Sequence, residues 1–134
     1  MTDDQKSIAR ACLEAAEQDA MPFPEIVATL IGAGFEGYAI DLRRSTAIYY
    51  LPDGASVELA ARRVDSPVAP ALDSAGLLAA IREAQQQVPG YSYRGFCEKT
   101  AVAGCASYYV SFSGARALYI GRTGETHVEH FPAP

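Results

Sequence analysis

Apolar and polar residues recur with two different periods along this chain, and the period changes at matching places in its two halves. Residues 4–18 predict a helix that Asp3 or Asp4 caps, because their apolar residues return at helical spacing on one stripe. The residues of that stripe are Ile8, Ala11, Cys12 and Ala15. Pro24 then opens a second predicted helix, at a position where its missing N–H costs nothing.

Three strand-like runs follow the second helix. They are residues 38–43, 46–51 and 56–59. In the first run Tyr38, Ile40 and Leu42 share one face, which indicates a strand with one buried side. The segment Pro52-Asp53-Gly54 predicts a turn between the second and third runs, since it holds three residues that favour turns.

The second half of the chain predicts the same elements in the same order. They are a helix that Ser74 caps and Pro89-Gly90 ends, a helix at residues 94–103, and strands at residues 107–112, 116–121 and 125–130. Residues 61–73 contain Pro67 and Pro70 and have no periodicity, which indicates a linker between the halves.

Residue identities also recur at a constant separation of 70 positions. The identical pairs are Ala33/Ala103, Gly34/Gly104, Tyr38/Tyr108, Ala47/Ala117, Tyr49/Tyr119 and Gly54/Gly124. If the second copy holds one extra residue, Val57-Glu58 also matches Val128-Glu129. Self-similarity at a fixed spacing reports architecture, so we predict an internal duplication with repeats at about residues 4–60 and 74–130.

The predicted fold is therefore α+β, with two αα-βββ units related by a pseudo-twofold axis in a single domain of residues 1–134. Its strands are mostly antiparallel, and its helices pack on one face of the sheet. The pattern leaves open whether the halves share one continuous sheet or form two sheets that face each other.

Composition narrows the class of protein. The formal net charge of −5 argues against a nucleic-acid partner, because phosphate binding needs a basic face, and only Arg43-Arg44 and Arg62-Arg63 offer one locally. No apolar run is long enough for a membrane span, and the acidic start does not look like a signal peptide. Three cysteines without regular spacing predict free thiols, no cofactor and a cytoplasmic location.

Four segments carry a resemblance to a known family. They are Phe23-Pro24-Glu25-Ile26, Ala33-Gly34-Phe35, Tyr38-Ala39-Ile40-Asp41-Leu42 and the closing run from Tyr119 to Pro132. Together they make the chain resemble the YdfO-like family of small bacterial and prophage-borne proteins over residues 20–134. The resemblance implies a compact α+β domain, and it implies no particular activity.

The last predicted strand is the best candidate for chemistry. Strand alternation places Glu125, His127 and Glu129 on one face, where they could hold a divalent metal, or His127 could serve as a general base beside Glu129. The alternative interpretation is the solvent face of an antiparallel sheet, where polar residues are expected.

The same alternation predicts a polar, tyrosine-rich surface on the face of the sheet away from the core. Its residues are Asp41, Arg43, Tyr49, Glu58, Tyr109, Tyr119, His127 and Glu129, and Arg122 lies in the turn beside them. Such a surface could be purely structural, could bind a protein, or could line a small-molecule pocket.

From these patterns we predict a non-enzymatic binding or regulatory module whose partner is a protein or a second copy of the chain, in a homodimer. The contact surface would be the non-core sheet face or an unprotected strand edge, with residues 46–51 and 108–113 as candidates. The alternative is a small-molecule or metal-dependent enzyme, or a ligand-binding protein, centred on His127 and Glu129.

Overall fold

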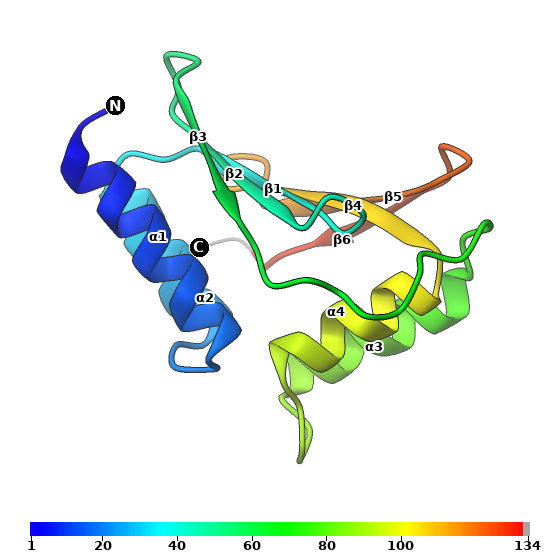
Figure 1. Cartoon of the computed structure of the whole chain (residues 1–134). Coiled ribbons are helices and arrows are strands. Elements are labelled where there is room, and N and C mark those ends of the chain that lie inside the picture. Colours follow the sequence, from blue (N-terminus) through cyan, green and yellow to red (C-terminus); the bar gives the residue numbers. More distant parts are fainter. Residues whose placement is uncertain (133–134) are drawn as a thin grey trace.

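The computed structural model describes residues 1–132, in which four helices and six strands follow the order ααβββααβββ. The first half contains α1 (Asp3–Glu17), α2 (Phe23–Gly32), β1 (Gly37–Asp41), β2 (Thr46–Tyr50) and β3 (Ser56–Ala60). The second half contains α3 (Ser74–Gln86), α4 (Tyr93–Val102), β4 (Cys105–Ser111), β5 (Arg116–Gly121) and β6 (Thr126–His130). The α+β class is confirmed (Figure 1).

Local side chains fix the helix starts, although not always the predicted ones. Thr2, rather than Asp3 or Asp4, caps α1 through a capping box in which Thr2 Oγ1 accepts the Gln5 N–H at 3.1 Å. Asp73, rather than Ser74, caps α3 by accepting the Gly76 N–H at 3.1 Å. In both helices the cap lies one or two residues earlier than predicted.

The buried stripe of α1 also differs from the prediction. Ala9, Cys12 and Leu13 are its buried residues, whereas Ala11 is exposed. Leu13 has the largest of the buried side chains in α1, so the helix turns to bury it, and Ala11 is left outside.

All six strands form one antiparallel sheet in the order β3-β2-β1-β4-β5-β6. The two halves meet where β1 pairs with β4, with Ala39 opposite Tyr109. The question left open by the sequence is therefore answered: the strands make one continuous sheet. Residues 46–51 and 108–113 belong to strands that are paired on both sides, so the predicted reactive edges were wrong, and the edges are β3 and β6.

Some element boundaries recur at the predicted separation of 70 residues. The bounds of α4 and β6 lie 70 positions after those of α2 and β3, and the left-handed residues Ser45 (φ 55°) and Ala115 (φ 50°) are also 70 apart. The extra residue proposed for the second copy was wrong, because β3 and β6 correspond without any insertion. A common origin of the two halves stays a prediction.

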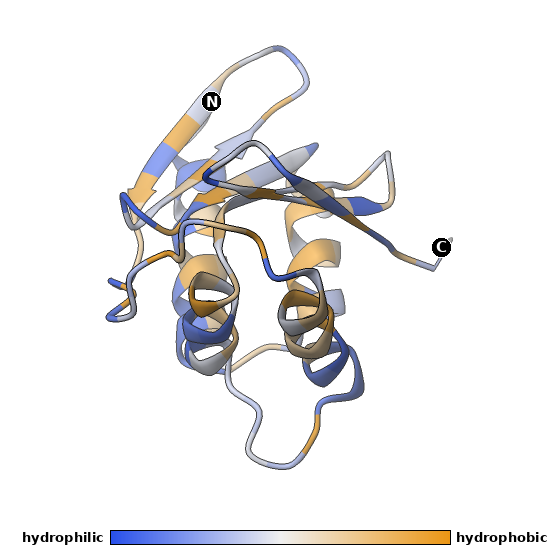
Figure 2. Ribbon diagram, turned by 90° about the vertical axis from the view of Figure 1, so that its right-hand side faces the viewer, coloured by the Kyte–Doolittle hydropathy of each residue, from blue (hydrophilic) through white to orange (hydrophobic). Residues whose placement is uncertain are grey.

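Both helix pairs lie on the same side of the sheet (Figures 1 and 2). Successive side chains of a strand point to opposite faces of the sheet, so every second residue faces the helices and forms the core with them. These inner-face residues are Tyr38, Ile40, Ala47, Tyr49, Leu59, Tyr108, Val110, Ala117 and Tyr119. The predicted face of Tyr38, Ile40 and Leu42 is confirmed as buried.

Candidate functional site

The side of the sheet turned away from the helices, the outer sheet face, carries a central row of apolar side chains. Strand register sets these residues directly side by side across the sheet. In order from β2 to β6 they are Ile48, Ala39, Tyr109, Leu118 and Val128, and Glu58 of β3 ends the row. No helix of residues 1–132 covers this row (Figure 1).

Aromatic packing extends the apolar surface beside the central row. The rings of Tyr50 and Tyr109 lie 6.3 Å apart by their centroids, and Tyr109 leans over Gly37 of the neighbouring strand. Ile120 adds an aliphatic side chain on the other side of the row and is half-buried. Exposed antiparallel faces are usually polar, so an apolar central row marks this face as a candidate contact surface.

Charged groups lie beside the central row or, in the case of Glu58, at its end. Glu58 and Asp41 lie on strands of the first half, and Arg116 and His130 lie on strands of the second half. The outer sheet face therefore has an acidic half and a basic half.

The structure corrects the face predicted for Tyr49 and Tyr119. Both point into the core, where they are 3% and 4% exposed, and burial raises the pKa of each phenol well above its usual range. The four-residue turn between β1 and β2 sets Tyr38 opposite Tyr49, so the two side chains share a face. The centroids of their rings lie 5.4 Å apart.

His127 and Glu129 also lie on the inner face, opposite Tyr119 and Ala117. Tyr119 Oη donates to Glu129 Oε1 at 2.9 Å, and Gln85 Nε2 of α3 donates to Glu129 Oε2 at 2.8 Å. Glu129 thus ties a helix to the edge strand, and His127 packs near the Tyr119 ring at 6.4 Å.

Glu125 is used separately from His127 and Glu129. Its carboxylate accepts hydrogen bonds from the Thr123 hydroxyl and from the Leu72 N–H, and these bonds lower its pKa. Within residues 1–132, no group of three or more His, Cys, Asp or Glu side chains is placed to hold a metal ion.

The remaining predicted site residues hold turns and the linker. Asp41 Oδ1 accepts the N–H groups of Arg43 and Arg44, each at 2.9 Å, which closes the turn after β1. Arg122 Nη1 donates to the Val68 carbonyl at 3.2 Å and so ties the β5–β6 turn to the linker. Asp41, Glu58 and Tyr109 therefore share the outer sheet face, whereas Tyr49 and Tyr119 do not.

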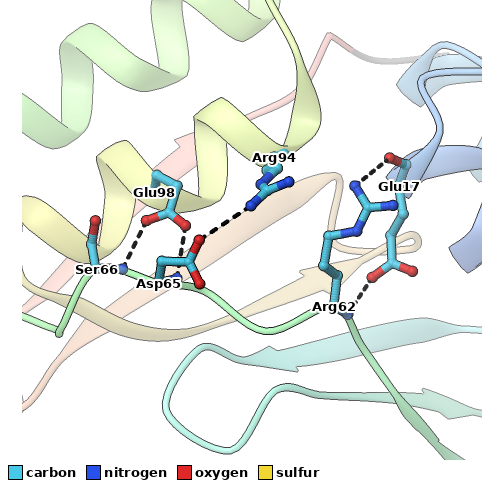
Figure 3. A network of polar contacts seen from close by, with 6 residues as sticks. All are labelled: Glu17, Arg62, Asp65, Ser66, Arg94 and Glu98. Atoms are coloured by element: carbon cyan, nitrogen blue, oxygen red, sulfur yellow. Dashed lines mark hydrogen bonds and ion pairs between the residues drawn. The ribbon is translucent and has the colours of Figure 1, made fainter.

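A polar network that sequence reasoning missed fixes the linker against both helix pairs (Figure 3). Glu98 of α4 accepts the N–H groups of Asp65 and Ser66 at 2.8 and 2.9 Å. Hydrogen bonding with the Ser66 side chain, and then with these N–H groups, lowers the pKa of the Glu98 carboxyl. Arg62 binds Glu17 of α1 through its backbone N–H and through Nη1. No local pattern could reveal these bonds, because their partners lie 32 or more positions apart.

A small cavity lies beneath this network, between α1, the β1–β2 turn, the linker and α4. Leu13, Ile40, Val64 and Cys97 are among its lining residues, and its volume is about 30 Å³. A second cavity beside the α3–α4 loop has a volume of about 90 Å³. Ligand pockets usually span about 300–1,000 Å³, so both cavities are of a size for water molecules.

The cysteine side chains are buried thiols. Burial raises the pKa of Cys97 to about 12 and that of Cys105 to about 11. The thiolate is the nucleophilic form, so neither thiol is activated for catalysis.

None of the helices in residues 1–132 has the length and apolar character that crossing a membrane requires.

A model of the family described as "Protein of unknown function (DUF1398)" matches residues 11–129. The match covers most of the chain, so the protein belongs to that family. No curated protein matches the chain.

Proposed function

We propose that this member of the DUF1398 family is a non-enzymatic protein-binding module whose contact surface is the outer sheet face. The observation that carries the proposal is the uncovered central row, in which Ile48, Tyr109 and Leu118 present apolar side chains to the surroundings. Water contact with such a row is unfavourable, and a partner that covers it gains about 25 cal/mol for each Å² of apolar surface removed from water.

The composition of the outer sheet face supports a protein partner. Two tyrosines, Tyr50 and Tyr109, stand in contact near its centre, and aromatic residues are enriched at the buried centres of protein interfaces. Charged side chains stay at the margin, where an interface is usually polar. Tyrosine is also enriched among the few residues that carry most of the binding energy of protein interfaces.

The geometry favours this function over the enzyme alternative. An enzyme centred on His127 and Glu129 needs a concave site in which these groups reach a substrate. Glu129 instead accepts hydrogen bonds from Tyr119 and Gln85, and the two cavities described are too small for a metabolite.

The test places a photoreactive phenylalanine derivative at position 109 and, as a control, at Arg82 on the surface of α3. Crosslinking in the native host, followed by mass spectrometry, identifies the protein bound at each position. The identified protein is then purified, and its affinity is measured for the wild type, Leu118→Lys and Arg82→Glu. We expect at least a tenfold loss for Leu118→Lys alone.

Two results would contradict this function. One is equal crosslinking from positions 109 and 82, and the other is an unchanged affinity for Leu118→Lys. Circular dichroism of each variant checks that the fold is retained, since the Leu118 side chain is half-buried on the surface and a lysine can extend into water there.

We propose in addition that the chain belongs among the YdfO-like, prophage-borne proteins of bacteria and acts in the cytoplasm. The four segments that carry the resemblance support the first point, and three buried free cysteines support a reducing compartment. Fractionation of the native host with an antibody against the protein tests the location: we expect the protein in the cytoplasmic fraction rather than with the envelope.

A further inference from the structure

We propose that the partner of the outer sheet face is a second copy of this chain, packed face to face about a twofold axis parallel to the strands. This inference rests on the proposed function and names the partner of the same surface. In such a dimer the acidic half of each outer sheet face lies on the basic half of the other. Three features of the surface carry the inference: its charge, its side-chain sizes and the symmetry that it allows.

Charge is divided between the two halves of the outer sheet face. Glu58 and Asp41 supply the negative charge from β3 and β1, and Arg116 supplies the positive charge from β5. His130 lies at the β6 edge, directly opposite Arg116 in the register of β5 and β6. Arg116 Nε also donates to the Gly114 carbonyl at 3.1 Å, which holds the guanidinium near this end of the sheet.

A twofold axis parallel to the strands, midway between β1 and β4, turns this division into attraction. It places each β3 over the partner's β6 and each β2 over the partner's β5. Each row of side chains across the sheet then lies over the same row of the partner. Glu58 then lies over the partner's Val128, and the partner's His130 is its diagonal neighbour, two residues further along β6. Tyr50 lies under the partner's Arg116. An arginine over a tyrosine ring is itself a favourable contact.

Side-chain sizes match in the same arrangement. In the central row the large ring of Tyr109 lies over the partner's Ala39, which is the pair that meets the size criterion. Ile48 lies over the partner's Leu118, and these two aliphatic side chains make an apolar contact beside it. Stacked sheets are about 10 Å apart, so a large residue needs a small one opposite it. The alternation of Ala39 and Tyr109 in neighbouring strands meets that need.

A twofold axis across the strands is disfavoured by the same two criteria. It would place Glu58 over the partner's Glu58 and Tyr109 over the partner's Tyr109. Like charges would repel, and two rings would occupy one space. The strand-parallel axis is therefore the symmetric arrangement that this surface fits.

The expected dimer is weak. Six strands at about 4.8 Å spacing and five residues at about 3.3 Å rise give a face of roughly 24 by 16 Å, or about 400 Å² on each partner, which is below the size of stable dimers and in the range of transient contacts. We therefore expect a reversible equilibrium in the micromolar range, which sedimentation velocity over a dilution series can follow.

Charge reversal provides the decisive experiment. Glu58→Lys should weaken the dimer at least tenfold, because the new lysine meets the partner's basic half, and adding His130→Glu should restore most of the loss. Glu58 and His130 lie on opposite edges of one sheet, about 24 Å apart, so rescue within one chain is not feasible. Leu118→Lys should remove the dimer, and Glu14→Lys, which makes the same charge change on the exposed face of α1, should leave it unchanged.

The outcomes separate this inference from the proposed function. A dimer that survives Leu118→Lys, or a Glu58→Lys defect that His130→Glu fails to restore, would overturn the face-to-face arrangement. A chain that stays monomeric at about 1 mM would also overturn it. In that case a different protein crosslinked at position 109 would keep the proposed function, and the lack of any crosslink there would remove both.

Discussion

Gly37 lies directly against the side chain of Tyr109 on the outer sheet face. A Cβ atom added at Gly37 would be 2.5 Å from Tyr109 Oη and 2.5 Å from the Val110 carbonyl oxygen. The glycine thus allows the ring to lie across the neighbouring strand, where it meets Tyr50. This packing holds the largest side chain of the central row in one position.

Two glycine substitutions should have opposite effects on the free energy of unfolding, because only one of the two glycines is in close contact with other residues. Gly37→Ala should lower the free energy of unfolding by about 1–3 kcal/mol, because the Val110 carbonyl belongs to the backbone and cannot move aside cheaply. Gly32→Ala meets no atom within 4 Å and should raise it by up to about 1 kcal/mol, because alanine lowers the entropy of the unfolded chain. Urea unfolding measures both, and an equal effect of the two changes would contradict the packing of Tyr109.

The buried hydroxyls of Tyr93 and Tyr108 form a second testable pair. They share a hydrogen bond of 2.6 Å between α4 and β4. Tyr93→Phe and Tyr108→Phe should each cost about 1–2 kcal/mol, since each leaves one buried hydroxyl without its partner. The double variant should cost little more than either single one, because no orphaned hydroxyl remains. Strictly additive losses in urea unfolding would show that the two groups are not coupled.

The elements of this fold could be predicted from the sequence, because local patterns determine them. Strand periodicity and helix spacing located all ten elements to within a few residues. The faces of β2 and β5 could not be read from alternation, since both strands carry apolar or aromatic residues on each side. The four-residue turn after Asp41 holds the missing information, because it fixes Tyr49 opposite Tyr38.

The candidate site was only partly predictable for the same reason. Asp41, Glu58 and Tyr109 were placed on the correct face, whereas the assignment of Tyr49 and Tyr119 to that face left their neighbours Ile48 and Leu118 on the core side. An aliphatic side chain carries no sign of which face it occupies until the register is known. The bonds of Glu98 and Arg62 to distant segments depend on the packed fold and have no local signal at all.

The linker network predicts unequal effects for two glutamates on neighbouring helices. Glu98→Ala should lower the free energy of unfolding by about 1 kcal/mol, because it releases the N–H groups of Asp65 and Ser66 at a partly solvated site. Glu83→Ala breaks only a surface ion pair with Lys99 and should cost about 0–1 kcal/mol. Limited proteolysis should cut residues 61–73 faster in Glu98→Ala alone. Equal cleavage in both variants would show that Glu98 does not hold the linker.

The buried thiols predict a loss of stability in alkali. Cys97 and Cys105 have pKa values of about 12 and 11 in the folded chain, against 9.0 for a free thiol, because burial disfavours the thiolate. Above pH 9 the unfolded chain releases these protons and the folded chain keeps them, so the free energy of unfolding falls as the pH rises from about 9 to 12. Below pH 9 their contribution is complete, and the urea midpoint should not depend on them.

The same burial predicts slow thiol chemistry at neutral pH. All three cysteines are buried, so the folded protein at pH 8 should react with a disulfide reagent only as fast as it opens, and in urea it should react at three thiols. Cys97→Ala should reduce the alkaline fall in stability without removing it, because it removes the group whose pKa is raised most among the thiols, whereas the buried tyrosines, whose pKa values are also raised, remain. A thiol that reacts in the folded state at the rate of a free cysteine would contradict this picture and would reopen the question of a nucleophile beneath the linker.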